Sequence, residues 1–224
     1  MPMLNVQRLA ILREVVTRGS FSGAANALSY TQSSVSQAVA KLEAETGLKL
    51  LEHGARLIGA PDLPRHVVFH PSTGEGLLEL AAREHADVVV FGSDYRTAAG
   101  AVIPQASAQR LLNGGPVAVA IAPADLRSRS SVSVARVGVL AEGDDAPEVT
   151  ARSLAAALGA SVTERDDEPV DLLVVGSREG TPTGRAELSA TASYAVDTST
   201  APVLVVPRGT PVIFPAPALA ESRA

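Results

Sequence analysis

Residues 20–39 read SFSGAANALSYTQSSVSQAV, and this stretch has the pattern of two short helices joined by a tight turn. In its first half, apolar side chains recur at helical spacing, at Phe21, Ala24, Ala25 and Leu28. Ser29 and Tyr30 then interrupt the pattern, and Thr31 supplies a side-chain oxygen that can cap a new helix. Two helices separated by so short a turn predict a helix-turn-helix motif, which points to DNA binding.

The second helix of this motif is expected to start at Gln32. Its apolar stripe consists of Val35, Ala38, Val39 and Leu42. The side chains left for solvent or a ligand are amides, hydroxyls and one amine, at Gln32, Ser33, Ser36, Gln37 and Lys41. Gln can pair with adenine and Ser can donate or accept a hydrogen bond, so this face suits the base edges of DNA. A three-helix packing unit without a ligand is the alternative, but the stripe is narrow and the polar face is not rich in carboxylates.

Residues 4–59 resemble the DNA-binding domain of LysR-type transcriptional regulators. Four elements follow in that family's order, namely LNVQRLAILREVVTRG, SFSGAANAL, TQSSVSQAVAKLEAETG and, for the β-hairpin wing, LKLLEHGARLIG. The resemblance implies a winged helix-turn-helix whose groove-facing residues are Thr31, Gln32, Ser33, Ser36 and Gln37. It also implies that Arg56, in the wing, lies near a phosphate, and we expect Lys41 and Lys49 to lie near the DNA backbone as well. Many members have Arg where this chain has Gln37, so one charged contact is expected to be absent.

Length and composition limit the remaining possibilities. With 224 residues, the chain is long enough for two domains of about 100 residues each. The absence of cysteine excludes disulfides and thiolate metal sites, and the four histidines show no metal-ligand spacing. No apolar run approaches the roughly 18 residues of a membrane span, and the N-terminus shows no secretion leader. We therefore expect a cytoplasmic protein that uses no metal or other cofactor and does not bind a membrane.

Charge is divided unevenly along the chain. Residues 1–60 contain six Lys or Arg against four Glu, whereas residues 61–224 contain 13 Arg against 20 acidic residues. Phosphate neutralisation dominates affinity for nucleic acids, so DNA is expected to meet the N-terminal part. An excess of two positive charges favours modest affinity unless two copies bind together.

The rest of the chain contains an internal repeat. The segment ADVVVFGSDYRTAAGAVIPQASAQRLLNGGPVAVAIAP, from Ala86, matches VDLLVVGSREGTPTGRAELSATASYAVDTSTAPVLVVP, from Val170, with an offset of 84 residues. In each copy, two runs of Val and Leu flank a loop and a helix, which predicts buried strands at residues 87–91, 117–121, 171–175 and 202–206. Further elements are expected as strands at 67–69 and 136–140 and helices at 74–84 and 146–158. These βαβ units predict a doubly wound, mostly parallel α/β sheet.

The two copies resemble the C-terminal portion of the universal stress protein family. In that family a strand ending in Gly-Ser opens a loop of the form G-x2-G-x9-G-[ST], whose backbone amides hold ATP phosphates. Here Gly92-Ser93 is followed by Tyr95 and Gln105 at the later glycine positions, and Gly176-Ser177 is followed by Glu179 and Ser189. A side chain in place of glycine blocks the approach of an anion, and the Glu179 carboxylate would repel phosphate. Tight ATP binding at these degenerate loops is therefore not expected.

Both copies are incomplete relative to that family. The first begins near His66, and the second begins with ARVGVLAEGDDAPEV, where Asp144 or Asp145 would stand for the family's adenine-contacting Asp. We expect the two remnants to share one sheet, joined by the connector RSRSSVS at residues 127–133. The predicted domains are thus 1–59 and 66–210, the latter with incomplete repeats 66–126 and 135–210, followed by a tail at 211–224. The prolines in Ala60-Pro61-Asp62-Leu63-Pro64 mark the boundary between the domains.

No catalytic constellation is present, because no Ser lies in a G-x-S-x-G turn and the acidic pairs are explained by solvation. The segment Asn113-Gly114-Gly115-Pro116 is interpreted as a turn that ends a helix. We expect a DNA-binding transcriptional regulator, not an enzyme, that binds double-stranded DNA as a homodimer. The α/β region would serve association or signal response, and the run at 202–207, left at a sheet edge, would pair two copies. The alternatives are a universal-stress-type scaffold or weak nucleotide binder without an operator, and a fusion of two unrelated reading frames.

Overall fold

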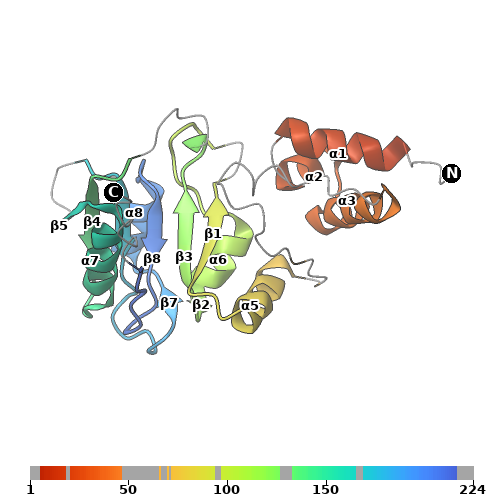
Figure 1. The fold of residues 1–224 in the computed structure, drawn as a ribbon. Coiled ribbons are helices and arrows are strands. Elements are labelled where there is room, and N and C mark those ends of the chain that lie inside the picture. Colours follow the sequence, from red (N-terminus) through yellow and green to blue (C-terminus); the bar gives the residue numbers. More distant parts are fainter. Residues whose placement is uncertain are drawn as a thin grey trace, which may run out of the picture. The chain divides into compact units, whose positions relative to one another are not determined.

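The computed structural model describes residues 6–18, 21–46, 66, 70, 72–93, 97–126, 133–164 and 169–215. The chain divides into two compact units, Met1–Phe69 and His70–Ala224, each of which is described by itself (Figure 1). The predicted wing at 48–59, the boundary at 60–64, the strand at 67–69 and most of the connector lie outside the described residues. No helix in the described ranges is long and apolar enough to cross a membrane.

The first unit contains three helices, α1 (Val6–Arg18), α2 (Phe21–Leu28) and α3 (Gln32–Thr46). They enclose a small apolar core of Ile11, Val15, Ala24, Ala25, Val35 and Val39. The predicted helix-turn-helix is confirmed: α2 ends at Leu28, Ser29 adopts a left-handed φ of 56°, and α3 begins at Gln32. Of the predicted stripe on α3, Ala38 is only half-buried, because it lies at the margin of this core.

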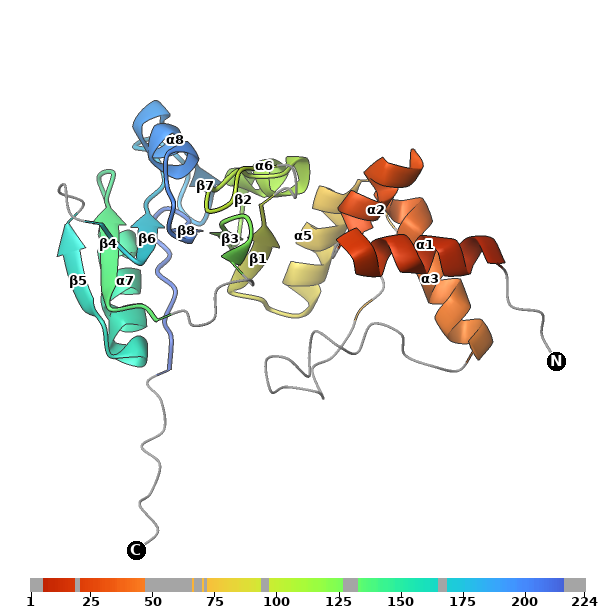
Figure 2. The ribbon, with the colours of Figure 1, turned by 90° about the horizontal axis from the view of Figure 1, so that it is seen from above.

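The second unit contains a six-stranded sheet in the order β1-β3-β8-β6-β4-β5 (Figure 2). Its strands are β1 (Val88–Gly92), β3 (Ala118–Ala122), β4 (Arg136–Leu140), β5 (Ser161–Glu164), β6 (Leu172–Val175) and β8 (Val203–Val205). Neighbouring strands are parallel except for β3 and β8, so the predicted mostly parallel sheet is confirmed. β5 was not predicted, because its sequence SVTE lacks the continuous apolar run of a central strand.

Helices cover both faces of this sheet, as Figure 2 shows for α6 and α8 on one side and α7 on the other. The helices of the unit are α5 (Thr73–Arg83), α6 (Ala106–Leu112), α7 (Ala146–Leu158) and α8 (Ala190–Asp197). Alternate side chains of β3 point to opposite faces, so that Val119 packs toward α6 and α8 while Ala118 packs toward the α7 side. α7 has Pro147 in its first turn and stops at Gly159, whose φ is 68°.

The internal repeat is visible in the structure as the unit β1-α6-β3, which recurs as β6-α8-β8 with the offset of 84 residues. Gly100 and Gly184, at equivalent positions, have φ values of 86° and 77°. β3 pairs with β8 in a register that places Ala120 opposite Leu204, its own equivalent. A local pseudo-twofold axis therefore passes between these strands, and the two remnants share one sheet, as predicted.

The prediction that the strand at residues 202–207 lies at a sheet edge is wrong. β8 pairs with β3 on one side and with β6 on the other, so its backbone is not available to a second molecule. The physical reason is that both copies lie in one chain, and the last strand of each is paired with the last strand of the other. The edges of this sheet are β1 and β5.

The interpretation of Asn113–Pro116 as a plain turn is also incomplete. Asn113–Gly115 forms strand β2, which pairs antiparallel with β7 (Ala186–Glu187) in a separate two-stranded sheet. Gly114 has a φ of 95°, and a Cβ on Gly115 would collide with the carbonyl of Leu111 at the end of α6. The two glycines are thus explained by a sharp reversal after α6 that leads directly into a strand.

Candidate functional site

The start of α3 is fixed by Thr31. Its side-chain oxygen accepts a hydrogen bond from the Ser34 N–H at 3.1 Å, and its carbonyl accepts one from the Val35 N–H at 3.1 Å. The Thr31 hydroxyl also lies 2.9 Å from that of Ser33 and 2.7 Å from that of Ser34. The predicted N-cap is therefore confirmed, and these bonds engage the Thr31 hydroxyl in holding the first turn of α3.

The side chains of α3 divide into a buried row and a polar row. Val35, Val39 and Leu42 are buried in the unit at 0%, 1% and 0% exposure. On the other side Gln32, Ser33, Gln37 and Lys41 are exposed and Ser36 is half-buried. Ser33, Gln37 and Lys41 follow one another at four-residue spacing, so they form a single line along the helix.

Most of this polar row has no partner among the residues that the structure describes. The side chains of Gln32, Ser36, Gln37 and Lys41 make no hydrogen bond or ion pair with any part of the chain that the structure describes. The structure thus brings these predicted residues together along the solvated side of a helix whose first turn is capped. Lys49 and Arg56, the predicted backbone contacts of the wing region, lie outside the described residues.

One stabilising contact of this unit was not predicted from the sequence. The Gln7 amide donates a hydrogen bond of 2.9 Å to the Tyr30 hydroxyl, which ties the turn between α2 and α3 to α1. A Tyr in the short turn between α2 and α3 was the available signal, but its partner lies 23 residues away and could not be identified from local spacing.

In the second unit, the serines of the two Gly-Ser loops form hydrogen bonds to the neighbouring strand. The hydroxyls of Ser93 and Ser177 donate to the carbonyls of Ala122 and Val206, at 2.7 Å and 2.8 Å. Each hydroxyl also accepts a backbone N–H, from Ile103 at 3.1 Å and from Glu187 at 3.3 Å. These equivalent bonds join the end of one strand to the end of its neighbour, which accounts for both serines without a bound nucleotide.

A carboxylate of the protein lies at the start of α8, the helix that follows the second Gly-Ser loop. The Ser189 hydroxyl caps α8 by accepting the Ala192 N–H at 3.0 Å, and it donates to the Glu142 carboxylate. In the first copy, the Gln105 amide donates to the Gly92 carbonyl at 2.9 Å, so a side chain fills the equivalent loop. The start of a helix attracts anions, but in these two loops the positions are taken by Glu142 and by the Gln105 side chain of the chain itself.

Arg208 holds the same loops together. Its guanidinium donates to the carbonyls of Glu142 and Arg178 at 3.3 Å each, and it lies 3.9 Å from the Asp144 carboxylate. Asp144 in turn accepts the Ala146 N–H at 2.8 Å and so supports the start of α7. These contacts were not predicted, because the four residues belong to three separate loops.

Comparison with known proteins divides the chain in the same way. Residues 6–59 match the family described as "Bacterial regulatory helix-turn-helix protein, lysR family". The "HTH-type transcriptional activator AaeR" of Escherichia coli K12 is 41% identical over 63 residues, 28% of this chain and 20% of that protein. The "Probable HTH-type transcriptional regulator LrrA" of Synechococcus elongatus is 44% identical over 80 residues, 36% of this chain and 24% of that protein. The similarity therefore spans only about a fifth to a quarter of the length of these relatives.

Solved structures similar to this chain share its α/β fold. A protein from Pseudomonas aeruginosa UCBPP-PA14, described as a universal stress protein, has a TM-score of 0.51 and 12% identity, over 70% of this chain and 76% of that chain. A functionally unknown protein from Pseudomonas aeruginosa PAO1 has a TM-score of 0.50 and 12% identity, over 76% of this chain and 87% of that chain. Both resemblances predicted from the sequence are thus confirmed, the second at the level of the fold.

Proposed function

We propose that this chain is a sequence-specific, DNA-binding transcriptional regulator whose α3 enters the major groove. The observation that carries the proposal is the row of polar side chains on a capped helix that have no partner among the described residues, within a segment that matches the lysR helix-turn-helix family. The relatives named as transcriptional regulators support the same activity. Regulators of this kind act by binding, so the proposal assigns no catalysis to the chain.

Within this proposal the residues of α3 have distinct roles. Gln32, Ser33, Ser36 and Gln37 read base edges, because amides and hydroxyls can match the donors and acceptors of the major groove. Thr31 lies at the groove as well, but it acts by fixing the first turn of α3. Lys41 and Arg56 contact phosphates, which adds affinity without specifying sequence.

The α/β unit is proposed to serve association or signal response rather than nucleotide hydrolysis. A DNA-binding unit with an excess of two positive charges neutralises few phosphates, so operator binding is proposed to need a homodimer. Glu142 at the start of α8, together with Tyr95 and Glu179 in the loops, supports the proposal that ATP does not bind tightly.

The test is selection of bound sequences from a random duplex pool with the full chain. An enriched motif is expected, and Gln37→Ala should cost about 1–3 kcal/mol on that motif and relax the preference at one base pair. Arg56→Ala should instead weaken all sequences alike and reduce the slope of log K against log salt by about 0.9. The two variants thus separate base readout from backbone contact.

Circular dichroism of the same preparations checks that each variant is folded. If a folded wild-type chain enriches no motif, the scaffold alternative replaces the regulator. If a motif is enriched but Gln37→Ala and Arg56→Ala leave binding unchanged, DNA is bound by another surface.

A further inference from the structure

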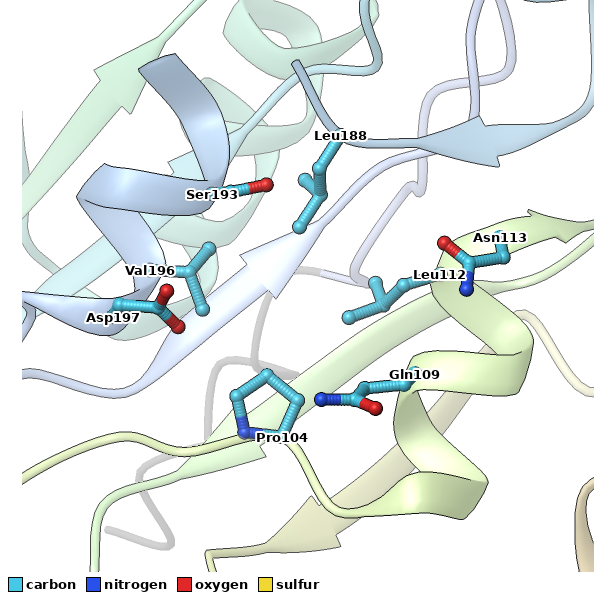
Figure 3. Close-up of a pocket in the computed structure, with 8 residues that line it drawn as sticks. All are labelled: Pro104, Gln109, Leu112, Asn113, Leu188, Ser193, Val196 and Asp197. Carbon is cyan, nitrogen blue, oxygen red and sulfur yellow. The ribbon is translucent and has the colours of Figure 1, made fainter. Parts of the chain in front are cut away.

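A cavity of about 240 Å³ lies between α6 of the first copy and α8 of the second, on the face of the sheet that these two helices cover (Figure 3). Its polar lining consists of two pairs of equivalent residues, Gln109 with Ser193 and Asn113 with Asp197, each pair separated by the repeat offset of 84 residues. The apolar lining follows the same rule, with Leu112 matched by Val196 and Pro104 by Leu188. Equal contributions from both copies place this cavity, which we call the axis pocket, on the pseudo-twofold axis.

The axis pocket combines an apolar wall with unpaired polar groups. Leu112 and Val196 belong to the buried core of the unit, at 3% and 1% exposure. In contrast, the side chains of Gln109, Asn113, Ser193 and Asp197 form no hydrogen bond or ion pair with other described residues. Gln109, Asn113 and Asp197 are exposed and Ser193 is half-buried, so the pocket is open to solvent and its polar groups are accessible to a small molecule.

The two copies differ in charge at the pocket. Asn113 in the first copy is neutral, whereas its equivalent Asp197 carries a carboxylate, and Figure 3 shows these two residues on opposite sides of the cavity. An unpaired carboxylate favours a cationic group, while the amides of Asn113 and Gln109 offer both donors and acceptors. The chemistry of the pocket is therefore unsymmetrical although its backbone is nearly symmetrical.

We propose that the axis pocket binds a small polar molecule with a protonated amine at one end and a hydrogen-bonding oxygen at the other. The amine meets Asp197, the oxygen meets Asn113 or Gln109, and the carbon chain between them lies on Pro104 and Leu188, the half-buried apolar residues of the lining. The volume is below the roughly 300–1,000 Å³ of pockets for drug-sized ligands, so the ligand is compact. This site goes beyond DNA binding, and because it joins the two copies, its ligand stabilises the α/β unit.

The experiment is a calorimetric titration of the full chain, without DNA, with amino alcohols from 3-aminopropan-1-ol to 6-aminohexan-1-ol. Saturable binding is expected to peak at one chain length, and alcohols of that length without the amine should bind at least tenfold more weakly. Asp197→Asn, which places Asn at both ends of the pocket, should lower the affinity at least tenfold. Asp87→Asn removes an exposed carboxylate that does not line the pocket and should leave the affinity unchanged.

Ser193→Phe tests the same site by volume, since a phenyl ring there fills the cavity while Asp197 is kept. Thermal unfolding checks that each variant is folded. A variant that is not folded is replaced by Gln109→Leu, which keeps the Asp197 carboxylate. Absence of saturable binding by the folded wild type overturns the proposal. Equal losses from Asp197→Asn and Asp87→Asn would overturn it too, because they indicate only general attraction of cations. Neither outcome depends on whether the chain binds DNA.

Discussion

Equivalent residues of the two copies show how the same sequence position acquires different physical roles. Val90 and Val174 are separated by the repeat offset, yet Val90 is 70% exposed and Val174 is 0% exposed. Val174 lies in an inner strand and belongs to the core on the α7 side, whereas Val90 lies on the edge strand β1. Burial, and not residue type, therefore decides how much each valine stabilises the unit.

We expect this difference to appear as a difference in stability. Val174→Ala removes two buried methyl groups and should lower the free energy of unfolding by about 1.5–3 kcal/mol. The matched variant Val90→Ala removes the same groups from an exposed site and should cost less than about 0.5 kcal/mol. Urea unfolding of the full chain measures both, and equal losses would contradict the position of α7 over β6.

Asp171 joins two parts of the second unit through its carboxylate. The side chain accepts the backbone N–H groups of Ala135 and Arg136 at 2.9 Å each, immediately before and at the start of β4. The Ala135 and Arg136 N–H bonds hold the pKa of this carboxyl below its usual range; burial opposes them, and the Arg136 charge adds a smaller lowering effect.

This lowered pKa predicts an acid dependence of stability. The stabilising contribution is complete above the unfolded-state pKa and is lost as the pH falls through the lower pKa of the folded state, below about pH 4. Asp171→Asn keeps an acceptor but cannot titrate, so between pH 6 and pH 3 it should lose less stability than the wild type. The difference should be at most about 1 kcal/mol, because the side chain is only half-buried. Unfolding midpoints in urea at both pH values measure it, and parallel losses would contradict the bonds to β4.

At the scale of elements, both copies keep their strands and the hydrogen bonds of Ser93 and Ser177. Both lack the later glycines whose backbone amides would hold phosphate. Ser189 caps α8 and donates a hydrogen bond to Glu142, which follows β4, so a carboxylate of the chain lies near the helix start. A second anion at this position would be repelled by Glu142.

Calorimetry with Mg-ATP should therefore show no saturable heat at micromolar concentrations. Glu142→Ser removes the carboxylate but leaves Glu179 and the missing glycines, so binding should improve to the millimolar range at most. A micromolar isotherm with the folded wild type would contradict this account of the loops and would favour the nucleotide-binding alternative.

At the scale of the whole molecule, β8 was expected to join two chains. It pairs instead with β3 and β6 of its own chain. Association of the second unit through its six-stranded sheet would have to use an edge strand, β1 or β5. If the first unit binds DNA as proposed, its weak positive charge favours two copies on DNA, because affinity grows with the number of neutralised phosphates.

We expect the full chain to bind duplexes with two half-sites at least tenfold more tightly than duplexes with one. Fluorescence anisotropy measures the affinities, and analytical ultracentrifugation of the complexes gives the number of chains bound. Equal affinity for both duplexes, with one chain on each, would show that a single copy is the binding unit.

The sequence by itself determined the helix-turn-helix, the repeat and the spans of most strands and helices. α7 begins and ends at the predicted residues, Ala146 and Leu158, and β4 matches its prediction as well. These features follow from local periodicity, apolar runs and capping residues, which act over a few positions. The polar face of α3 was predictable for the same reason, since burial of its apolar stripe leaves its remaining side chains in solvent.

Only the tertiary structure decided which distant segments meet. The inner position of β8, the pairing of β2 with β7, the approach of Glu142 to Ser189 and the axis pocket all join residues far apart in the chain. Each copy has the same local pattern, so the pattern could not show that the final strands would pair with each other. That choice depends on burying both apolar faces of one shared sheet, which is a property of the assembled unit and not of any segment within it.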